Sequence, residues 1–591
     1  MDERLRAPDQ VVFTNKARCR DCYRCLRNCP VKAISMHEGQ ARVEAERCIS
    51  CGTCIRECPQ GAKVFRNDVE RAKRLLEAGA PVAASIAPSF VAFLPAWEQR
   101  RLASALRKLG FAHVSETAIG AYHVARETAR LAAARPGQSH VCTACPAVVS
   151  FVEKYDPEAA PMLLPIVSPM LAHARHIKTK LGPDARVVFI GPCVAKKAEA
   201  QRPEHAGLVD CVLTFAELAE WLEAEGISLS ACEESSFDDQ PAGDARLFPL
   251  VGGSVRTASL TTDVLAQDVI SVSGHPDVVE ALSSAKEGGA PALIEPLFCP
   301  QGCVNGPAIG GTRNVYARRQ DVLSYADDTP GVPPDNAVCP PLVTRFTPAE
   351  ADSEADITEE AIRLVLEETG KGKPEDQLNC GACGYPSCRD KAIAVIRGMA
   401  EAQMCIPYMR RLAEQRTDKI IESSPNGIVI VDERLNILSM NPAFRRFFMC
   451  SEAVLGKKIS YLMDPDPFER LVAEDEDLIE TVVRHERYNL VCHEILYPMR
   501  DDQQFVGIFV NVTNSIASET PLDQLRAQTV SQARELLQHQ IRMAQEMAQS
   551  LGESTARGEQ LVENLLRLAG GESDQSDQKN SAWPWDTSTS K

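Results

Sequence analysis

EPLFCPQGCVNGPAIGG, residues 295–311, sets Cys299 and Cys303 four positions apart, just ahead of a group of glycines. A zinc knuckle or a thioredoxin site would use a C-x2-C spacing, and a ferredoxin run would carry more cysteines nearby. Two thiolates at this spacing cannot complete a metal site alone. The remaining ligands must come from other parts of the chain.

The length and the charge of the chain limit the number of its domains and the class of protein to which it can belong. Its 591 residues are too many for one hydrophobic core, so four or five domains are expected. A formal charge of −17 argues against a nucleic-acid binder, which needs a basic face. The charge-free run 78–97 contains Pro81, Pro88 and Pro95, so it predicts a buried strand and a turn rather than a membrane helix. The charged N-terminus carries no apolar signal segment, which predicts a cytoplasmic protein.

The 22 cysteines cluster sharply, as metal ligands do in a reducing compartment. Residues 19–30, CRDCYRCLRNCP, and 48–59, CISCGTCIRECP, both read C-x2-C-x2-C-x3-C-P. This is the bacterial two-cluster ferredoxin run, in which the fourth cysteine of each run ligates the other cluster. One [4Fe-4S] cluster is therefore expected on Cys19, Cys22, Cys25 and Cys58, and the other on Cys48, Cys51, Cys54 and Cys29. Two structural zinc sites are the alternative.

Residues 80–325 alternate strand-like runs such as DARVVFIGP with helical runs such as FAELAEWLEAEG. This alternation is typical of α/β folds with parallel sheets, which bind ligands at the carboxyl ends of their strands. Cys142, Cys145 and Cys193 follow such strands, as do Cys299 and Cys303. The sequence thus predicts one site assembled from three separate segments.

Three segments, TACP (143–146), PCVAKKAE (192–199) and FCPQGCVNG (298–306), resemble the three signature motifs of the [FeFe]-hydrogenases. APS (87–89) and SP (168–169) also stand where that family has them. The resemblance covers roughly residues 1–325. It implies that Cys145, Cys193, Cys299 and Cys303 bind the cubane of the hydrogen-activating cluster. Cys303 would also bridge this cubane to a diiron subsite that carries CO, cyanide and a dithiolate.

The resemblance also implies roles for polar residues. Lys196 matches the lysine that hydrogen-bonds one cyanide, and Pro88 and Ser89 match the segment that cradles the other. A buried lysine suits an anionic ligand in a dry pocket. Lys196, Ser168 and Glu127 form the candidate catalytic set. The alternative for Lys196 and Lys197 is a solvated surface pair.

The chain departs from the proton-reducing pattern at Ala144, where such enzymes carry a cysteine that relays protons. Losing a positioned acid–base group typically costs about 10²–10⁴-fold in rate. Cys142 is expected to be an unreactive buried cysteine, and helix 123–135 offers only Glu127 for a proton path. Gly191 and Leu297 replace methionines that pack around the diiron site. A centre that is redox-responsive but slow is predicted.

Residues 378–409 place Cys380, Cys383, Cys388 and Cys405 as C-x2-C-x4-C-x16-C, with a helix between the last two. This resembles a small [4Fe-4S] domain of electron-transfer proteins, and zinc is again the alternative. Residues 328–356, rich in Pro, Asp and Ala, are expected to be a linker.

Residues 420–448 alternate apolar residues, turn at DERLN and continue into a short helix with Asn441 and Phe444. This is similar to the opening of a PAS domain, a sensing and dimerising fold with a five-stranded antiparallel sheet. From 522 to 568, leucines and other apolar residues recur near heptad spacing, which predicts a short coiled coil. His539 is expected on its surface, because no kinase domain follows. The last residues are polar, which predicts disorder.

The expected fold class is multidomain α/β and α+β. Its expected domains are a ferredoxin-type head (1–70), a two-lobed hydrogenase-like core (80–327), a further [4Fe-4S] domain (357–412), a PAS domain (413–515), an output helix (516–570) and a disordered tail (571–591). This order resembles the sensory, PAS-containing [FeFe]-hydrogenases and implies an H₂ or redox sensor. Implied partners are a ferredoxin-like electron carrier, H₂ or protons, a second copy of the chain, and a kinase or phosphatase. Two alternatives stay open: a catalytic hydrogenase with another proton route, and an electron-transfer protein without the diiron subsite.

Overall fold

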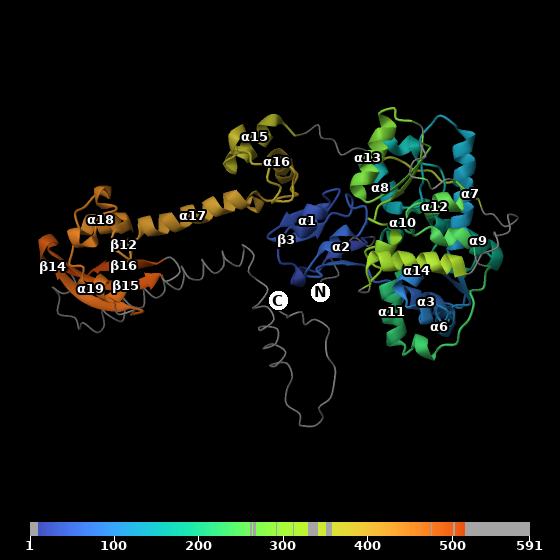
Figure 1. Ribbon diagram of the computed structural model, residues 1–591, viewed down its shortest axis with the longest axis horizontal. Coiled ribbons are helices and arrows are strands. Elements are labelled where there is room, and N and C mark those ends of the chain that lie inside the picture. Colours follow the sequence, from blue (N-terminus) through green and yellow to red (C-terminus); the bar gives the residue numbers. More distant parts are fainter. Residues whose placement is uncertain are drawn as a thin grey trace, which may run out of the picture. The chain divides into compact units, whose positions relative to one another are not determined.

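The computed structural model describes residues 10–240, 242–260, 263, 268–290, 292–310, 313–328, 341–349, 357–473, 476–499 and 503–513. The chain divides into two compact units, Met1–Arg410 and Arg411–Lys591. Figure 1 labels the helices and strands of both units. The expected mixture of α/β and α+β folds is confirmed, because two parallel sheets and a five-stranded antiparallel sheet are present among the described residues.

The head contains two short antiparallel strand pairs and one short helix for each cysteine run. The strands are β1 (Val12–Thr14) with β4 (Lys63–Phe65), and β2 (Ile34–His37) with β3 (Gln40–Val43); the helices are α1 (Arg24–Asn28) and α2 (Thr53–Glu57). The two halves repeat each other closely. Cys29 Sγ accepts the backbone N–H of Ala33 at 3.3 Å, and Cys58 Sγ accepts that of Ala62 at 3.2 Å.

The first lobe of the core is built on a four-stranded parallel sheet with strand order β6-β5-β8-β9. Its strands are β5 (Val82–Ile86), β6 (His113–Glu116), β8 (Arg186–Gly191) and β9 (Cys211–Thr214), and the helices that lead into it or connect it are α3 (Val69–Glu77), α4 (Phe90–Phe93), α5 (Ala96–Gln99), α6 (Leu102–Lys108), α7 (Ala118–Ala134), α9 (Pro169–Leu181), α10 (Ala195–Glu199) and α11 (Phe215–Ala224). Every residue of β5 is buried, as expected of a strand in a parallel sheet covered on both faces. The charge-free run is therefore the buried strand and turn that the sequence predicts.

The second lobe is a three-stranded parallel sheet with strand order β10-β11-β7. Its elements are β7 (His140–Val141), β10 (Val269–Ser273), β11 (Leu293–Leu297), α8 (Pro146–Tyr155) and α13 (His275–Lys286), whereas α12 (Gly253–Thr257) contacts α7 and α14 (Val315–Asp328) contacts α4 of the first lobe. Helices α7 and α9 run side by side at one edge of the core (Figure 1). They approach so closely that a Cβ on Gly120 would lie 2.3 Å from the Pro169 carbonyl oxygen, so only glycine fits there.

The described part of the expected linker packs on the core. Residues 341–349 place Val343 in a β-bridge with Ile166, and the Thr344 N–H bonds the Pro165 carbonyl at 3.1 Å. The Ala349 N–H reaches the Glu153 carbonyl at 2.8 Å. These backbone hydrogen bonds make this stretch part of the core rather than a free connection.

The small domain that follows consists of α15 (Glu359–Glu368), α16 (Cys388–Ile396) and the start of α17 (Ile406–Ser423). The helix after Cys388 is shorter than the sequence predicts. It ends because Gly398 takes a φ of +68°, and the Met399 N–H then bonds back to the Ala394 carbonyl at 2.8 Å. This arrangement is a Schellman turn, which needs a residue that tolerates positive φ.

The second unit holds a five-stranded antiparallel sheet with strand order β13-β12-β16-β15-β14, as predicted. Its elements are β12 (Gly427–Asp432), β13 (Ile437–Met440), α18 (Pro442–Phe447), α19 (Asp466–Ala473), β14 (Ile479–His485), β15 (Leu490–Met499) and β16 (Gln504–Asn511). Asn441 caps α18 by accepting the N–H of Phe444 at 2.9 Å, and it also accepts the N–H of Ile428 at 2.9 Å. One amide side chain thereby joins the first strand to the first helix of the PAS fold.

The predicted output helix and polar tail, residues 516–591, lie outside the described residues. Within the described ranges, no helix is both long enough and apolar enough to cross a bilayer.

Candidate iron–sulfur centres

The predicted core ligands all follow the carboxyl ends of parallel strands. Ser89 comes shortly after β5, and Cys193 and Lys196 come shortly after β8, in the first lobe. In the second lobe, Cys145 follows β7, and the pair Cys299 and Cys303 follows β11. Such strand ends are where open α/β sheets bind ligands.

These ends meet at one cavity. Its lining includes Cys145, Cys193, Cys299 and Cys303, together with Cys51 of the ferredoxin head. Two sheets and a separate domain thus contribute thiols to one space. The four cysteines that the motifs select are brought together, and Cys51 is an addition.

The C-x3-C loop of residues 299–303 can turn so tightly because of two glycines. Gly302 takes a φ of +86°, and a Cβ there would lie 2.5 Å from the Pro249 carbonyl oxygen. A Cβ on Gly306 would lie 2.8 Å from the Pro192 carbonyl oxygen. Any larger residue would push the loop away from the segment that carries Cys193. The glycines therefore hold both thiols of this loop at the cavity.

Burial dominates the electrostatics of these thiols. It raises the pKa of Cys193 to about 11, and the neighbouring Cys145 adds to the rise. Burial also raises the pKa of Cys299 and of Cys303, with Cys193 as the next contributor in both. Thiolates in such surroundings need a positive centre beside them, which iron supplies when a cluster binds.

Lys196 lies at the junction of the two lobes. Its side chain is buried, and its Nζ donates to Glu199 Oε2 at 2.7 Å and to the Ala144 carbonyl oxygen at 3.3 Å. The first contact is within α10, and the second reaches the loop after β7. The reading of Lys196 and Lys197 as a solvated surface pair is wrong, because they are only 8% and 1% exposed.

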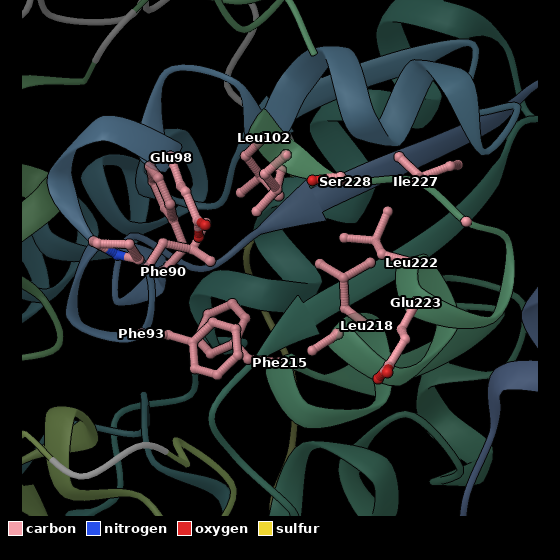
Figure 2. Close-up of a pocket in the computed structure, with 15 residues that line it drawn as sticks. Phe90, Phe93, Glu98, Leu102, Phe215, Leu218, Leu222, Glu223, Ile227 and Ser228 are labelled. Carbon is pink, nitrogen blue, oxygen red and sulfur yellow. The ribbon is translucent and has the colours of Figure 1, made fainter. Parts of the chain in front are cut away.

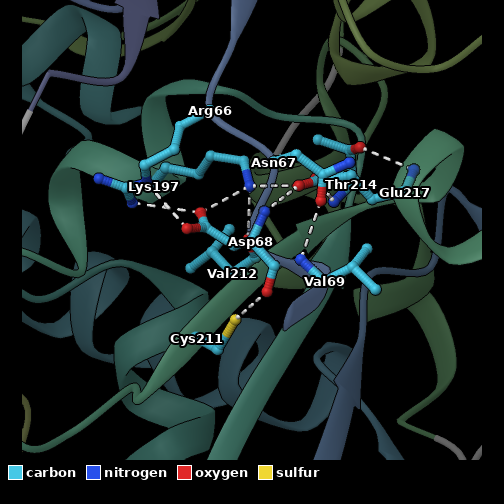
Figure 3. A network of polar contacts seen from close by, with 9 residues as sticks. All are labelled: Arg66, Asn67, Asp68, Val69, Lys197, Cys211, Val212, Thr214 and Glu217. Atoms are coloured by element: carbon cyan, nitrogen blue, oxygen red, sulfur yellow. Dashed lines mark hydrogen bonds and ion pairs between the residues drawn. The ribbon is translucent and has the colours of Figure 1, made fainter. Parts of the chain in front are cut away.

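Lys197 points away from this junction into a separate polar network (Figure 3). Its Nζ donates to Asp68 Oδ2 at 2.8 Å and to Glu217 Oε1 at 2.9 Å. It also donates to the Val212 carbonyl oxygen at 2.8 Å. Asp68 precedes α3, and Glu217 belongs to the capping box of α11. Lys197 therefore fastens the segment that follows the head to the first lobe.

Two of the predicted serines carry buried hydroxyls without a partner. Ser89 is 1% exposed and Ser168 is 2% exposed, and neither Oγ has a hydrogen-bond partner among the described residues. Ser89 follows Pro88 after β5, and Ser168 precedes α9. A buried unpaired hydroxyl is costly unless a bound group pairs with it. These hydroxyls can therefore pair with a bound polar group, but neither serine is among the residues that line the cysteine cavity.

The predicted proton-path residues are placed differently. Glu127 is held by Arg130 through two hydrogen bonds of 2.6 and 2.8 Å, and the Arg130 side chain is 64% exposed. Cys142 is buried, and burial raises its pKa, as expected of an unreactive thiol. The Phe189 ring occupies the space beside Gly191, where a Cβ would come within 2.7 Å of the ring. Glu127 thus takes part in a surface ion pair rather than a buried relay.

The head also gathers its predicted ligands. One cavity is lined by Cys29, Cys48, Cys51 and Cys54, so the fourth cysteine of the first run does cross to the second run. In the other half, Cys19 and Cys22 lie near enough to Cys25 for their charges to raise its pKa. Cys58 follows α2 at the position equivalent to Cys29 after α1.

The cavity in the small domain is lined by all four predicted cysteines, Cys380, Cys383, Cys388 and Cys405. Four cysteines can hold either a [4Fe-4S] cluster or a zinc ion, so this lining fits both the predicted cluster and its zinc alternative.

This domain packs directly on the head. Arg27 donates to the Ala382 carbonyl oxygen at 3.2 Å, and the Met36 N–H bonds the Met399 carbonyl at 3.1 Å. Tyr385 is 5% exposed, and its pKa is raised to about 12 by burial and then by the charges of Cys383 and Cys29, although Arg47 opposes this. A predicted ligand of the small domain and a predicted ligand of the head therefore both lie near this tyrosine.

Sequence reasoning missed three features of these sites: Cys51 in the core cavity, the Lys197 network, and the buried lysines of the small domain. A signal for the first was available. Gly52 stands where the first cysteine run has Tyr23, and both take positive φ. A Cβ on Gly52 would lie 2.4 Å from Pro307 of the core, so this break in the repeat marks the contact with the core.

A further cavity of about 520 Å³ lies between α4–α6 and α11 (Figure 2). Its lining is mainly apolar, and Phe93 stacks on Phe215 at 5.5 Å between ring centroids. Glu98 and Glu223 are its acidic residues. It shares no lining residue with the cysteine cavities.

Comparison with known families assigns a separate family to each of four parts of the chain. Residues 80–307 match the iron-only hydrogenase large subunit, C-terminal domain, and residues 18–62 match a 4Fe-4S dicluster domain. Residues 376–407 match an Fe-S cluster family, and residues 415–484 match a PAS domain.

Similar curated proteins include the NADP-reducing hydrogenase subunit HndD of Solidesulfovibrio fructosivorans, 28% identical over 39% of this chain. The chain spans about half of that subunit, 48% of its length. The periplasmic [Fe] hydrogenase large subunit of Nitratidesulfovibrio vulgaris is also 28% identical, over 51% of this chain and 86% of its own length. The cytosolic Fe-S cluster assembly factor NAR1 of Vanderwaltozyma polyspora is 35% identical over 91 residues, which are 15% of this chain and 17% of that protein.

Among solved structures, a variant of [FeFe]-hydrogenase HydA1 from Chlamydomonas reinhardtii aligns with 19% identity and a TM-score of 0.37, over 48% of this chain and 99% of its own. The PAS domain of an HTR-like protein from Haloarcula marismortui aligns with 19% identity and a TM-score of 0.16, over 18% of this chain and 98% of its own. The chain is thus a hydrogenase-like iron–sulfur protein that combines an iron-only hydrogenase domain with a 4Fe-4S dicluster domain and a PAS domain.

Proposed function

We propose that this protein is a redox or H₂ sensor with slow hydrogen turnover, in which a hydrogenase-like core communicates with a PAS domain. The proposal rests on which side chains meet at the junction of the two lobes and on which side chain is missing there. The four core cysteines and Lys196 are gathered there, but the side chain at the relay position is the methyl group of Ala144.

In this proposal, Cys145, Cys193, Cys299 and Cys303 hold a [4Fe-4S] cluster, and Cys303 also holds a diiron subsite. The diiron group, with its CO, cyanide and dithiolate ligands, would supply the site at which H₂ binds and is split. Lys196 and Ser89 would hydrogen-bond its anionic ligands. The buried unpaired hydroxyls of Ser89 and Ser168 support such a polar occupant.

Slow turnover follows from what surrounds the core cavity. Its lining contains no carboxylate and no histidine among the described residues. Glu127 is tied to Arg130 at the surface, and the Ala144 carbonyl oxygen already accepts a hydrogen bond from Lys196. Protons therefore lack a positioned carrier of the kind that speeds such reactions by about 10²–10⁴-fold.

The cysteine sets are arranged as a connected series, which supports redox communication. Cys51 belongs to the second set of the head and also lines the core cavity. Cys29 of the same set and Cys383 of the small domain both lie near enough to Tyr385 for their charges to raise its pKa. An external ferredoxin-type carrier, a PAS-mediated dimer and a kinase or phosphatase partner belong to the same proposal.

The second candidate is an electron-transfer protein without a diiron subsite. The similarity to cluster assembly factors of the NAR1 type favours it, because the name of those proteins assigns no hydrogen chemistry. The Phe189 ring beside Gly191 also fills space where the hydrogenase resemblance implies a methionine against the diiron site.

Infrared spectroscopy separates the two candidates. Protein matured with a diiron cofactor should show bands from iron-bound CO and cyanide, and these bands should shift when H₂ replaces argon. The Cys303→Ser variant should lose the bands while the dicluster head stays reducible. Competent maturation that leaves no such bands would overturn the sensor proposal in favour of the electron-transfer protein. A wild type that evolves H₂ as fast as proton-reducing enzymes would contradict slow turnover.

A further inference from the structure

The four-cysteine cavity of the small domain has two lysines in its lining. Lys371 and Lys391 line it together with Cys380, Cys383, Cys388 and Cys405. Each lysine is only 5% exposed. Lys391 stands three positions after Cys388 on α16, so both side chains face the same side of the helix. Two ammonium groups are thus buried beside four thiols.

Neither lysine has a carboxylate partner among the described residues. Lys391 Nζ donates to the Ala402 carbonyl oxygen at 2.7 Å, and Lys371 Nζ donates to the Asp376 carbonyl oxygen at 3.3 Å. Lys197 in the core is a clear contrast, because it bonds Asp68 and Glu217 within 3 Å. A buried charge without a counter-charge costs several kcal/mol, so these two lysines keep their charges only where an anion lies beside them.

A third source of positive potential reaches the same cavity. Helix α17 begins at Ile406, directly after Cys405, and Ile406 and Pro407 line the cavity. The helix is 18 residues long, and the N–H of Met409 bonds the Cys405 carbonyl at 2.8 Å. The positive end of its macrodipole therefore lies at the cavity.

We propose that Lys371 and Lys391 are the counter-cations of the small-domain cluster and that they raise its reduction potential. The inference rests on the proposed binding of a [4Fe-4S] cluster by Cys380, Cys383, Cys388 and Cys405. An oxidised cubane with four thiolates carries a net charge of about −2, which two ammonium groups balance. Reduction by one electron adds a further negative charge, and nearby cations stabilise that reduced form.

The raised reduction potential affects which cluster of the protein holds an added electron. Buried cations make the reduced state of this cluster easier to reach, with the added charge held at the first turn of α17. Because α17 starts directly after Cys405 and continues to Ser423, just before the first strand of the PAS fold, a change of charge at this cluster acts on the helix that leads into that domain.

Redox titration of the full chain, followed by electron paramagnetic resonance, tests the inference. Lys371→Met and Lys391→Met remove one charge each at similar volume. Each should lower the reduced-to-oxidised ratio of this cluster at least tenfold at a fixed potential, which is about 59 mV for a one-electron couple. The double variant should shift further. Lys373→Met is the matched control, because Lys373 lies two residues away and its side chain is 76% exposed; it should leave the midpoint unchanged.

Two further variants keep the outcomes distinct. Cys388→Ser should remove one cluster from the iron content and from the spectrum, which identifies the signal that is titrated. If it removes neither, the cluster assignment fails, whatever the lysines do. If the cluster is present and the double lysine variant keeps the wild-type midpoint, the counter-cation inference is overturned.

Loss of the cluster on substitution is also informative. Lys391→Arg keeps the charge, so it should retain iron and midpoint even if Lys391→Met loses iron. Loss of iron in the arginine variant as well would show that packing around Ala402, rather than charge, is what the cluster needs, and this too would overturn the inference.

Discussion

The core cavity and the small-domain cavity both collect four cysteines, yet they are built in opposite ways. The core draws Cys145, Cys193, Cys299 and Cys303 from the ends of three strands in two sheets. The small domain draws all of its ligands from 26 consecutive residues, Cys380 to Cys405, around one helix. The core lining carries no charged residue among those described, whereas the small domain buries two lysines.

This difference separates two ways of making an iron–sulfur site. A local site needs only a short loop and a helix, and it can tune its charge with side chains of the same loop. A site between lobes depends on the packing of the whole domain, because each ligand is fixed by a different strand. Changes far from the ligands should therefore disturb the core more than the small domain.

The largest expected effect is complete loss of one site with retention of the other. Cys299→Ser should remove the core cubane and leave the small-domain cluster, because the two share no lining residue. Cys388→Ser should do the reverse. Iron analysis and Mössbauer spectra measure both. Loss of both clusters from either single variant would break the comparison, since it would show that the two sites form one cooperative structure.

Lys197→Met tests the dependence of the core on distant packing. It leaves Glu217, which is 2% exposed, and Asp68, which is 6% exposed, without their shared cation, and breaking a buried pair in this way costs about 3–5 kcal/mol. The free energy of unfolding of the core should fall by that amount in urea titrations followed by Trp221 fluorescence. Lys108→Met, at an exposed lysine, is the control. Equal stability of the two variants would contradict the role of the Lys197 network.

Acid should weaken the core and spare the small domain. Burial lowers the pKa of His123 to about 4 and that of His173 to about 3, whereas an unfolded chain has a histidine pKa of about 6.5. The unfolded state then binds more protons below about pH 6.5. Core stability is thus fully present above that pH and falls as the pH drops toward 4, by up to about 1.4 kcal/mol per pH unit for each histidine.

The small domain provides the matched region for this test, because residues 357–410 contain no histidine. The measurement is unfolding of the core by Trp221 fluorescence between pH 4 and 7. His123→Leu should flatten the profile, since its Nε2 has no hydrogen-bond partner among the described residues. A profile that stays flat in the wild type would mean that these histidines are not held neutral.

The smallest expected effect concerns Ala144. Ala144→Cys restores a thiol at the lobe junction, so H₂ evolution by the matured protein should rise roughly tenfold, less than a complete relay provides. The rise is partial because Glu127 stays bound to Arg130. Ala144→Ser is the control for added volume and polarity. An unchanged rate in the cysteine variant would show that a step other than proton transfer limits turnover.

The sequence could predict most of the fold and the ligand sets because their signals are local. The two C-x2-C-x2-C-x3-C-P runs predict which cysteines are near each other, and Cys29 lines one cavity with Cys48, Cys51 and Cys54 of the second run. Strand-like runs followed by cysteines located the core site, since parallel strands end at a common edge. The alternation of residues 420–448 likewise identified the PAS sheet.

Only the tertiary structure decided which contacts each of two neighbouring residues makes. Lys196 and Lys197 are adjacent and chemically identical, but successive residues on a helix point about 100° apart, so one reaches Ala144 and the other reaches Asp68. Lys371 and Lys391 come from separate parts of the small domain, and only its folding brings both beside the same four cysteines. Sequence specifies which ligands a loop can offer, but burial and charge balance arise from contacts between distant segments, which no local pattern contains.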